Sequence, residues 1–173
     1  MAGGAYQGAG IEHNELGAPT ASGAMHARMT EKRFRKLDSL REHVELFVSE
    51  GDSRAELALI SWGSSAGVCR EALQLAAQEG LRVKLFVPYL LYPVVEEPYR
   101  TFHSSVRAGF VVELSYQGQL YRMLRMFLDL PQELRSLARP GANPFQPREL
   151  VGRLRDLALE LQRQPGETLQ PHE

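Results

Sequence analysis

Five residues between two apolar segments, Gly63-Ser64-Ser65-Ala66-Gly67, are of types and spacing that could carry chemistry. They follow the apolar run 56–62 and precede an amphipathic segment, a pattern that predicts a strand, a tight turn and a helix. The G-x-S-x-G spacing is that of a hydrolase nucleophile elbow. Glycines and serines at the start of a helix could also present backbone N–H groups to an anion. The third interpretation is structural, with Gly63 making the turn and Ser64 or Ser65 capping the helix.

The rest of the chain favours the structural interpretation of this turn. A hydrolase triad would place an acid and then a histidine after Ser65. The aspartates after it are Asp129 and Asp156, and His103 precedes both, which leaves only His172, the penultimate residue. For the anion-binding interpretation, both the G-x-G-x-x-G pattern and a Walker lysine are missing. A cap is therefore favoured over a catalytic serine and over a phosphate ligand.

Two further groups of reactive residue types are weaker candidates. Cys69 shares a helical stripe with Ala72 and Ala76, which predicts a core residue rather than a catalytic thiol. As the only cysteine, it excludes a disulfide framework and an iron–sulfur cluster held by this chain alone. The segment 11–17 (IEHNELG) offers carboxylates and a histidine, but zinc needs three or four converging ligands and only His26 is near. We expect a solvated loop there.

Composition limits the class of protein and its partners. The 173 residues are 43% hydrophobic and 24% charged, with a net charge of −1, as expected for a globular domain without a general affinity for nucleic acid or membranes. Segment 28–41 has six basic and two acidic residues, but no aromatic stacking platform accompanies it, so we interpret it as a charged helix face. The start of the chain lacks the pattern of a signal peptide, and the run 85–95 is too short to span a bilayer. These features predict a cytoplasmic protein.

Strand and helix patterns alternate along the chain. We expect a helix over 28–50 with the stripe Phe34, Leu37, Leu40, Val44 and Phe47, strands at 56–62, 82–87 and 109–116, an ambiguous segment at 132–140, and helices at 65–80, 96–106, 118–130 and 143–164. This order predicts a three-layer α/β/α fold with a mainly parallel sheet of about four or five strands. We expect a Gly/Ala-rich arm at 1–27, a single α/β domain at 28–163 and a frayed tail at 164–173.

In a parallel sheet, functional groups gather beyond the carboxyl ends of the strands. The loops expected there are GSSAG (63–67), PYLLYPV (88–94), SYQGQ (115–119) and RPGANPF (139–145). The candidate interface or active-site-edge residues are Ser64, Ser65, Tyr92, Tyr116, Gln117, Gln119, Arg122 and Asn143. The alternative for Tyr92 and Phe145 is that their rings fold back onto the core.

Six segments also carry a family resemblance. They are IEHNELGAPT, RMTEKRFRKLD, SWGSSAGVCREAL, VKLFVPYLLYPV, VVELSYQGQLYRMLR and RPGANPF. Their order and spacing over about residues 8–155 resemble the C-terminal part of the alpha subunit of 2-oxoacid:ferredoxin oxidoreductases, most closely the 2-oxoglutarate enzymes. The resemblance implies a fold like the C-terminal domain of transketolase.

The resemblance also implies a role in a larger complex. Such a complex uses thiamine diphosphate, coenzyme A and iron–sulfur clusters to decarboxylate a 2-oxoacid oxidatively to an acyl-CoA and to reduce ferredoxin. The thiamine-contacting Y-P-I-T-P-type motif is not in this sequence, nor are the cofactor-binding domain and cysteines of the beta subunit. We therefore expect no catalytic, cofactor-binding or metal-binding residues here, and partners in the beta subunit and the remainder of the alpha subunit. The alternative is a stand-alone protein-interaction or small-anion-binding module of the same fold. The sequence leaves the identity of the 2-oxoacid open.

Overall fold

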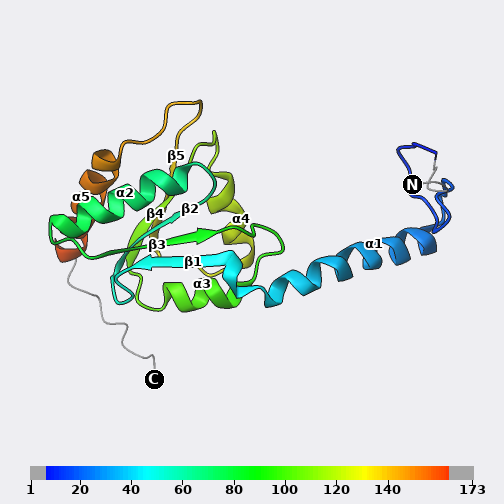
Figure 1. Cartoon of the computed structure of the whole chain (residues 1–173), viewed down its shortest axis with the longest axis horizontal. Coiled ribbons are helices and arrows are strands. Elements are labelled where there is room, and N and C mark those ends of the chain that lie inside the picture. Colours follow the sequence, from blue (N-terminus) through cyan, green and yellow to red (C-terminus); the bar gives the residue numbers. More distant parts are fainter. Residues whose placement is uncertain (1–6, 164–173) are drawn as a thin grey trace, which may run out of the picture. The chain divides into compact units, whose positions relative to one another are not determined.

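The computed structural model describes residues 7–163, and these fall into two compact units that divide after His43 (Figure 1). Unit 1 is described over residues 7–43 and unit 2 over residues 44–163. Each unit is described by itself. The expected frayed tail, 164–173, and the first six residues of the expected arm lie outside the described residues. The expected domain boundary at residue 28 stays a prediction.

Unit 1 consists of a loop, the helix α1 (Gly23–Asp38) and a 3-10 turn, η1 (Ser39–Glu42). Ser22 caps α1, because its Oγ accepts a hydrogen bond of 3.3 Å from the backbone N–H of Met25. The helix therefore begins before Arg28, and it ends well before Gly51. The prediction of one helix over 28–50 is wrong at both ends.

The C-terminal part of that expected helix is a strand in unit 2. After η2 (Val44–Leu46), the strand β1 (Phe47–Gly51) pairs antiparallel with β3 (Val83–Pro88), with Phe47 opposite Pro88. The apolar spacing from Phe34 to Phe47 fits a helix, but edge pairing with a strand 36 residues further along the chain outweighs it.

Unit 2 has a five-stranded sheet in the order β1-β3-β2-β4-β5. Its other strands are β2 (Leu57–Ser61), β4 (Ala108–Glu113) and β5 (Glu133–Ala138), and its helices are α2 (Ser65–Gln78), α3 (Glu96–His103), α4 (Gln119–Phe127) and α5 (Pro147–Arg163). Strands β2 to β5 are all parallel to one another. The mainly parallel sheet is confirmed, and the ambiguous segment 132–140 is the strand β5.

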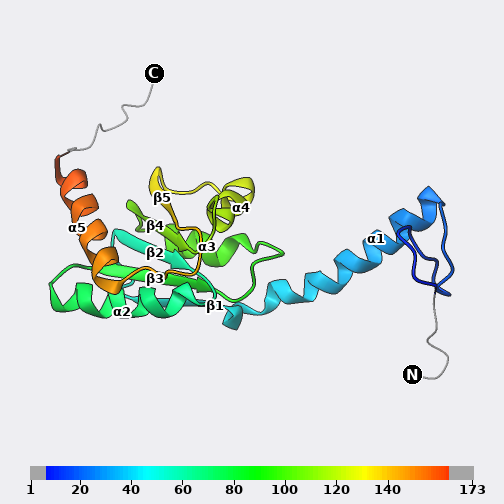
Figure 2. The ribbon, with the colours of Figure 1, turned by 90° about the horizontal axis from the view of Figure 1, so that it is seen from above.

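Helices cover both faces of this sheet, which confirms the three-layer architecture (Figure 2). On one face, Cys69 of α2 and Leu154 of α5 pack against β-strand residues such as Leu59. On the other face, Tyr99 of α3 and Leu124 of α4 belong to a second buried cluster. Because the central strands are buried on both sides, their sequences read as continuous apolar runs.

One charged group lies inside the second face. Lys84 of β3 is only 2% exposed, and its Nζ donates to the carbonyl oxygen of Phe102 (2.5 Å) and to Ser105 Oγ (2.8 Å). Desolvation lowers the pKa of this ammonium group. The carbonyl of Phe102 belongs to the last turn of α3, where the helix dipole favours a cation. Lys84 therefore fixes the end of α3 near the amino end of β3.

Candidate functional site

The carboxyl edge of the sheet brings together four loops that are distant in sequence. Ser61 lies opposite Val112, and Glu113 lies opposite Ala138, so β2, β4 and β5 end at the same level. The loop after β3 leaves at this edge as well, because Ile60 pairs in parallel with Phe86. The parallel pattern predicted this common edge.

In the first loop, Gly63 makes the turn as predicted, with a φ of 56° that favours glycine. The backbone N–H of Ala66 donates to the carbonyl of Gly63 at 3.2 Å. The predicted serine cap is wrong. Ser64 occupies the N-cap position, but its backbone is already helical and its side chain makes no capping hydrogen bond. Ser65 is in the first helical turn and is only 7% exposed.

Among the described residues of unit 2, no histidine lies beside this turn. His103 lies at the C-terminal end of α3, next to the Lys84 contact at the opposite edge of the sheet, so it is remote from Ser65. Cys69 is fully buried, and burial raises the pKa of its thiol to about 11. His103 therefore cannot act as the base of a nucleophile elbow at Ser65, and His172 lies outside the described residues. Cys69 is a buried core residue, as predicted.

The loop after β4 is built around a buried carboxylate that the sequence analysis missed. Glu113 is 1% exposed, and its two oxygens accept hydrogen bonds from the backbone N–H groups of Leu120 (3.0 Å) and Tyr121 (3.2 Å). Ser115 Oγ accepts from the N–H groups of Gly118 (3.0 Å) and Gln119 (3.3 Å). The N-terminus of α4 is thus occupied by the protein's own carboxylate, where the helix dipole favours a negative charge. It is not an open anion site.

A hydrogen bond from α2 reaches the loop after β3, and an ion pair holds the loop after β5. Arg70 Nε lies 2.7 Å from Glu50 Oε1, and its Nη2 donates to the hydroxyl of Tyr89 at 3.3 Å. Arg139 contacts Glu149 at 2.6 Å and lies 4.1 Å from the ring centroid of Phe145. Burial alone would raise the pKa of Glu149, but the hydrogen bonds and charge of Arg139 outweigh it and lower this pKa.

The side chains that these loops present to solvent are largely aromatic or amide groups. Tyr116 is 82% exposed, and Tyr92 is 49% exposed with its ring in edge-to-face contact with Phe127. Phe145 is buried in the core, so the alternative that its ring folds back onto the core is confirmed. Tyr92 is exposed, so the same alternative is wrong for Tyr92. Trp62, which the sequence analysis missed, is partly exposed directly after β2.

The remaining candidate residues are exposed, and the structure brings some of them together. Arg122 Nη1 donates to Gln117 Oε1 at 3.3 Å, so the helix α4 supports the loop that precedes it. Gln119 and Asn143 are exposed at the same edge of the sheet, on the loops after β4 and β5. Glu113 could have been suspected from its place, since it ends a buried strand just before a helix N-terminus.

The described residues offer no set of ligands for a metal ion. Between residues 7 and 163, no three His, Cys, Asp or Glu side chains converge for metal coordination. Two hollows lie away from the carboxyl edge. One of about 350 Å³ is lined by Arg54, Arg82 and Arg107, and one of about 310 Å³ is lined by His103 and Asp129. Within residues 7–163, no helix is long and apolar enough to cross a membrane.

The fold and the carboxyl edge of the sheet define the class of this protein. It is a three-layer α/β domain whose loops at that edge expose aromatic and amide side chains. No family model matches the chain. The chain is 35% identical to a solved 2-oxoglutarate:ferredoxin oxidoreductase from Magnetococcus marinus, determined with 2-oxoglutarate, coenzyme A and succinyl-CoA bound. The TM-score is 0.74, and the match covers 88% of this chain and 26% of the other.

Curated relatives agree with this match. The chain is 32% identical over 146 residues to 2-oxoacid:ferredoxin oxidoreductase 2, subunit alpha, of Aeropyrum pernix, covering 83% of this chain and 23% of the relative. It is 24% identical over 149 residues to 2-oxoglutarate synthase subunit KorA of Methanothermobacter marburgensis, covering 84% and 39% respectively. The chain is thus homologous to a segment of the alpha subunits of 2-oxoacid:ferredoxin oxidoreductases, and it spans between about a quarter and two fifths of their length.

Proposed function

We propose that this chain acts as the C-terminal, transketolase-like domain of the alpha subunit of a 2-oxoacid:ferredoxin oxidoreductase, with 2-oxoglutarate as the substrate of the complex. The observation that carries the proposal is the match to the Magnetococcus marinus enzyme, which includes most of this chain at 35% identity. In this proposal the chain contributes to subunit assembly and to the surroundings of the active site, and it is inactive alone. The complex would work in the cytoplasm and pass electrons to ferredoxin.

The cofactors of the complex belong, in this proposal, to its other parts. One cysteine is too few for an iron–sulfur cluster, and that cysteine is buried in the core. The described residues also provide no carboxylate set for the divalent cation that accompanies a diphosphate. In this proposal thiamine diphosphate, the iron–sulfur clusters and coenzyme A are therefore cofactors of the whole complex.

The carboxyl edge is the surface that would face the rest of the complex. Its exposed aromatic rings and amides are the side chains that protein interfaces favour over open solvent. The Arg70–Tyr89 hydrogen bond, the Arg139–Glu149 ion pair and the Glu113 cap hold the backbone of three of these loops, which lowers the entropy cost of assembly. The exposed candidate contact residues at this edge are Ser64, Tyr92, Tyr116, Gln117, Gln119, Arg122 and Asn143, whereas Ser65 is buried.

The test is co-expression of the chain with the beta subunit and the remainder of the alpha subunit from the same organism. We expect the three to copurify and to reduce a viologen dye with 2-oxoglutarate and coenzyme A, while the isolated chain does not. Tyr116→Ala or Gln119→Ala should weaken assembly or lower turnover and leave the melting temperature of the isolated chain unchanged.

Gln162→Ala is the matched control, because Gln162 is exposed at the opposite end of unit 2, beside the arginine-lined hollow. Failure of the wild-type chain to join the complex would favour the stand-alone interaction module. Normal assembly and turnover of both edge variants would place the functional surface elsewhere.

A further inference from the structure

A hollow at the amino edge of the sheet in unit 2 has no role in the proposed function. Strands β3, β2 and β4 begin at the same level, because Leu57 pairs in parallel with both Val83 and Ala108. The charged residues that directly precede these three strands therefore lie side by side, and they are Arg82, Glu56 and Arg107.

The segment after α2 and the last turns of α5 complete this hollow, which has a volume of about 350 Å³. We call it the amino-edge hollow. Its lining includes three guanidinium groups and three leucine side chains, those of Arg54, Arg82, Arg107, Leu57, Leu81 and Leu161.

The guanidinium groups at the amino-edge hollow keep most of their hydrogen-bond donors free. Arg82 Nε lies 2.5 Å from Asp52 Oδ2, and Arg107 Nη1 lies 3.1 Å from Glu56 Oε2. Within residues 7–163, the other guanidinium nitrogens of Arg82 and Arg107 donate to no acceptor, and the guanidinium of Arg54 donates to none at all. Three guanidinium groups thus face two carboxylates, which leaves one positive charge and several N–H donors for a ligand.

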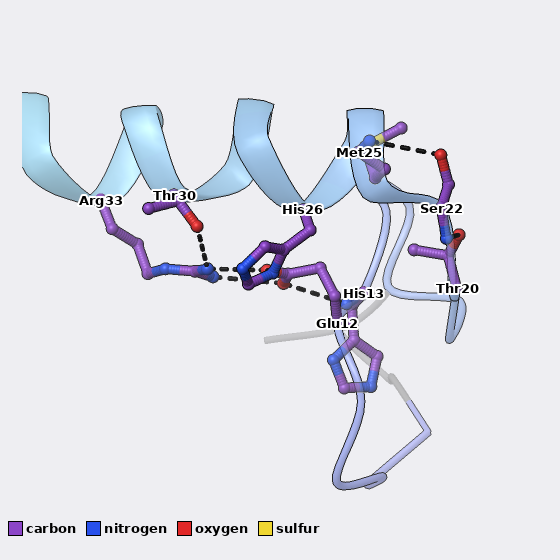
Figure 3. A network of polar contacts seen from close by, with 8 residues as sticks. All are labelled: Glu12, His13, Thr20, Ser22, Met25, His26, Thr30 and Arg33. Carbon is purple, nitrogen blue, oxygen red and sulfur yellow. Dashed lines mark hydrogen bonds and ion pairs between the residues drawn. The ribbon is translucent and has the colours of Figure 1, made fainter.

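Arg33 in unit 1 shows the opposite arrangement (Figure 3). Glu12 accepts from both terminal nitrogens of this guanidinium, at 2.6 and 3.2 Å, and Thr30 Oγ1 accepts from one of them at 3.1 Å. His26 Nδ1 lies 3.1 Å from the same carboxylate, and the hydrogen bonds from Arg33 lower the pKa of Glu12 to about 2. Glu12 therefore holds the segment 11–17 to α1, and the guanidinium of Arg33 is bound within its own chain.

The leucines give the amino-edge hollow an apolar wall. Leu57 is only 6% exposed, and Leu81 and Leu161 pack partly buried against the core of the same face. A volume of about 350 Å³ is within the range of small-molecule pockets, which combine apolar walls with a few polar groups that orient the ligand. The planar fork of a guanidinium matches the two oxygens of a carboxylate. An apolar wall beside one unbalanced positive charge therefore fits a singly charged anion with an apolar body.

We propose that the amino-edge hollow binds a small organic monocarboxylate. In this proposal the carboxylate pairs with Arg54, and Arg82 and Arg107 donate from the nitrogens that their ion pairs leave free. The apolar body of the ligand lies on the leucine wall. A phosphate dianion fits less well, because Asp52 and Glu56 already balance two of the three guanidinium charges.

The experiment titrates the full 173-residue chain with hydrocinnamate and follows binding by calorimetry and by the leucine methyl signals in NMR spectra. We expect one-site binding that shifts the methyl signals of Leu57, Leu81 and Leu161. Hydrocinnamyl alcohol, which has the same body without the charge, should bind about tenfold more weakly or worse, and so should inorganic phosphate, which lacks the body. Added salt should weaken the binding of hydrocinnamate, because the charges at the hollow are partly exposed.

The variant that tests the site is Arg54→Gln. It should weaken the dissociation constant for hydrocinnamate by about tenfold or more and leave the melting temperature of the free chain unchanged, because this guanidinium has no partner within residues 7–163. Arg148→Gln is the matched control and should bind normally, since Arg148 is exposed in the first turn of α5, at the other end of that helix from the hollow.

Each other outcome overturns the proposal. Absence of binding at about 10 mM hydrocinnamate would refute it, and so would equal binding of the acid and the alcohol. Binding that Arg54→Gln leaves unchanged, or that shifts signals of the carboxyl-edge loops in place of the three leucines, would place the ligand elsewhere. Tighter binding of phosphate than of hydrocinnamate would refute the choice of a monocarboxylate. All of these results would leave the proposed function standing, because it rests on the match to the relatives and not on this hollow.

Discussion

The half-buried histidine on the second face of the sheet should make this protein sensitive to acid. His103 ends α3, its Nε2 is buried and has no hydrogen-bond partner among the described residues, and its ring packs beside Tyr99 and Phe102. Burial, together with the charge of Lys84, lowers the pKa of His103 from its ordinary 6.5 to about 4.

The sign and size of the effect follow from linkage. Between pH 6.5 and 4 the unfolded chain binds a proton at this position that the folded chain does not, so stability falls as the pH falls. One pKa unit corresponds to about 1.4 kcal/mol. The shift therefore predicts a loss of about 2 kcal/mol of unfolding free energy between pH 7.5 and pH 5, a measurable share of the stability of a typical domain.

The assay is urea unfolding of wild type and His103→Phe at pH 7.5 and pH 5. Phenylalanine keeps a ring against Tyr99 and Phe102 but cannot titrate, so the variant should lose about 2 kcal/mol less than wild type over this interval. Equal pH dependence of wild type and His103→Phe would refute the assignment of the acid sensitivity to His103.

Three other perturbations test the packing of unit 2. Glu113→Gln should lower the unfolding free energy by about 2 kcal/mol, because it removes the charge from two buried hydrogen bonds at the start of α4. Thermal unfolding of the variant and the wild type measures this loss of stability. Gly118→Ala should destabilise the domain, because φ of Gly118 is 68° and an added Cβ would lie 2.4 Å from Ser136 Oγ. The control is Gly152→Ala on α5, where the added Cβ meets open space. This change should be neutral or stabilise the domain by up to about 1 kcal/mol. Cys69 should resist iodoacetamide at pH 8 until the protein unfolds, because the thiol is buried and its pKa is about 11; labelling of the native protein at the rate of a free thiol would contradict this.

The order of strands and helices in unit 2 could be predicted because each element carries its own local pattern. The mostly apolar sequences of β2, β3 and β4 predict strands buried on both faces, and the apolar stripes of α2 and α5 predict helices that cover them. Cys69 could be placed for the same reason, since its neighbours three and seven residues along the helix are alanines of the core. Gly63 could be assigned to a turn because few other residues adopt its backbone conformation.

Tertiary structure alone decided the features whose partners are distant in the chain. Phe47 continues the helix-like apolar spacing that begins at Phe34, and only pairing with β3 makes residues 47–51 a strand. Glu113 and Lys84 look like ordinary surface residues until a helix N-terminus and the end of α3 are brought to them. In the sequence, Leu16 is one apolar residue among polar ones. It is exposed in a loop that the ion pair between Glu12 and Arg33, 21 residues apart, holds to α1. A local pattern fixes which conformation a segment prefers, whereas a buried charge or an exposed apolar tip depends on groups that only folding brings into contact.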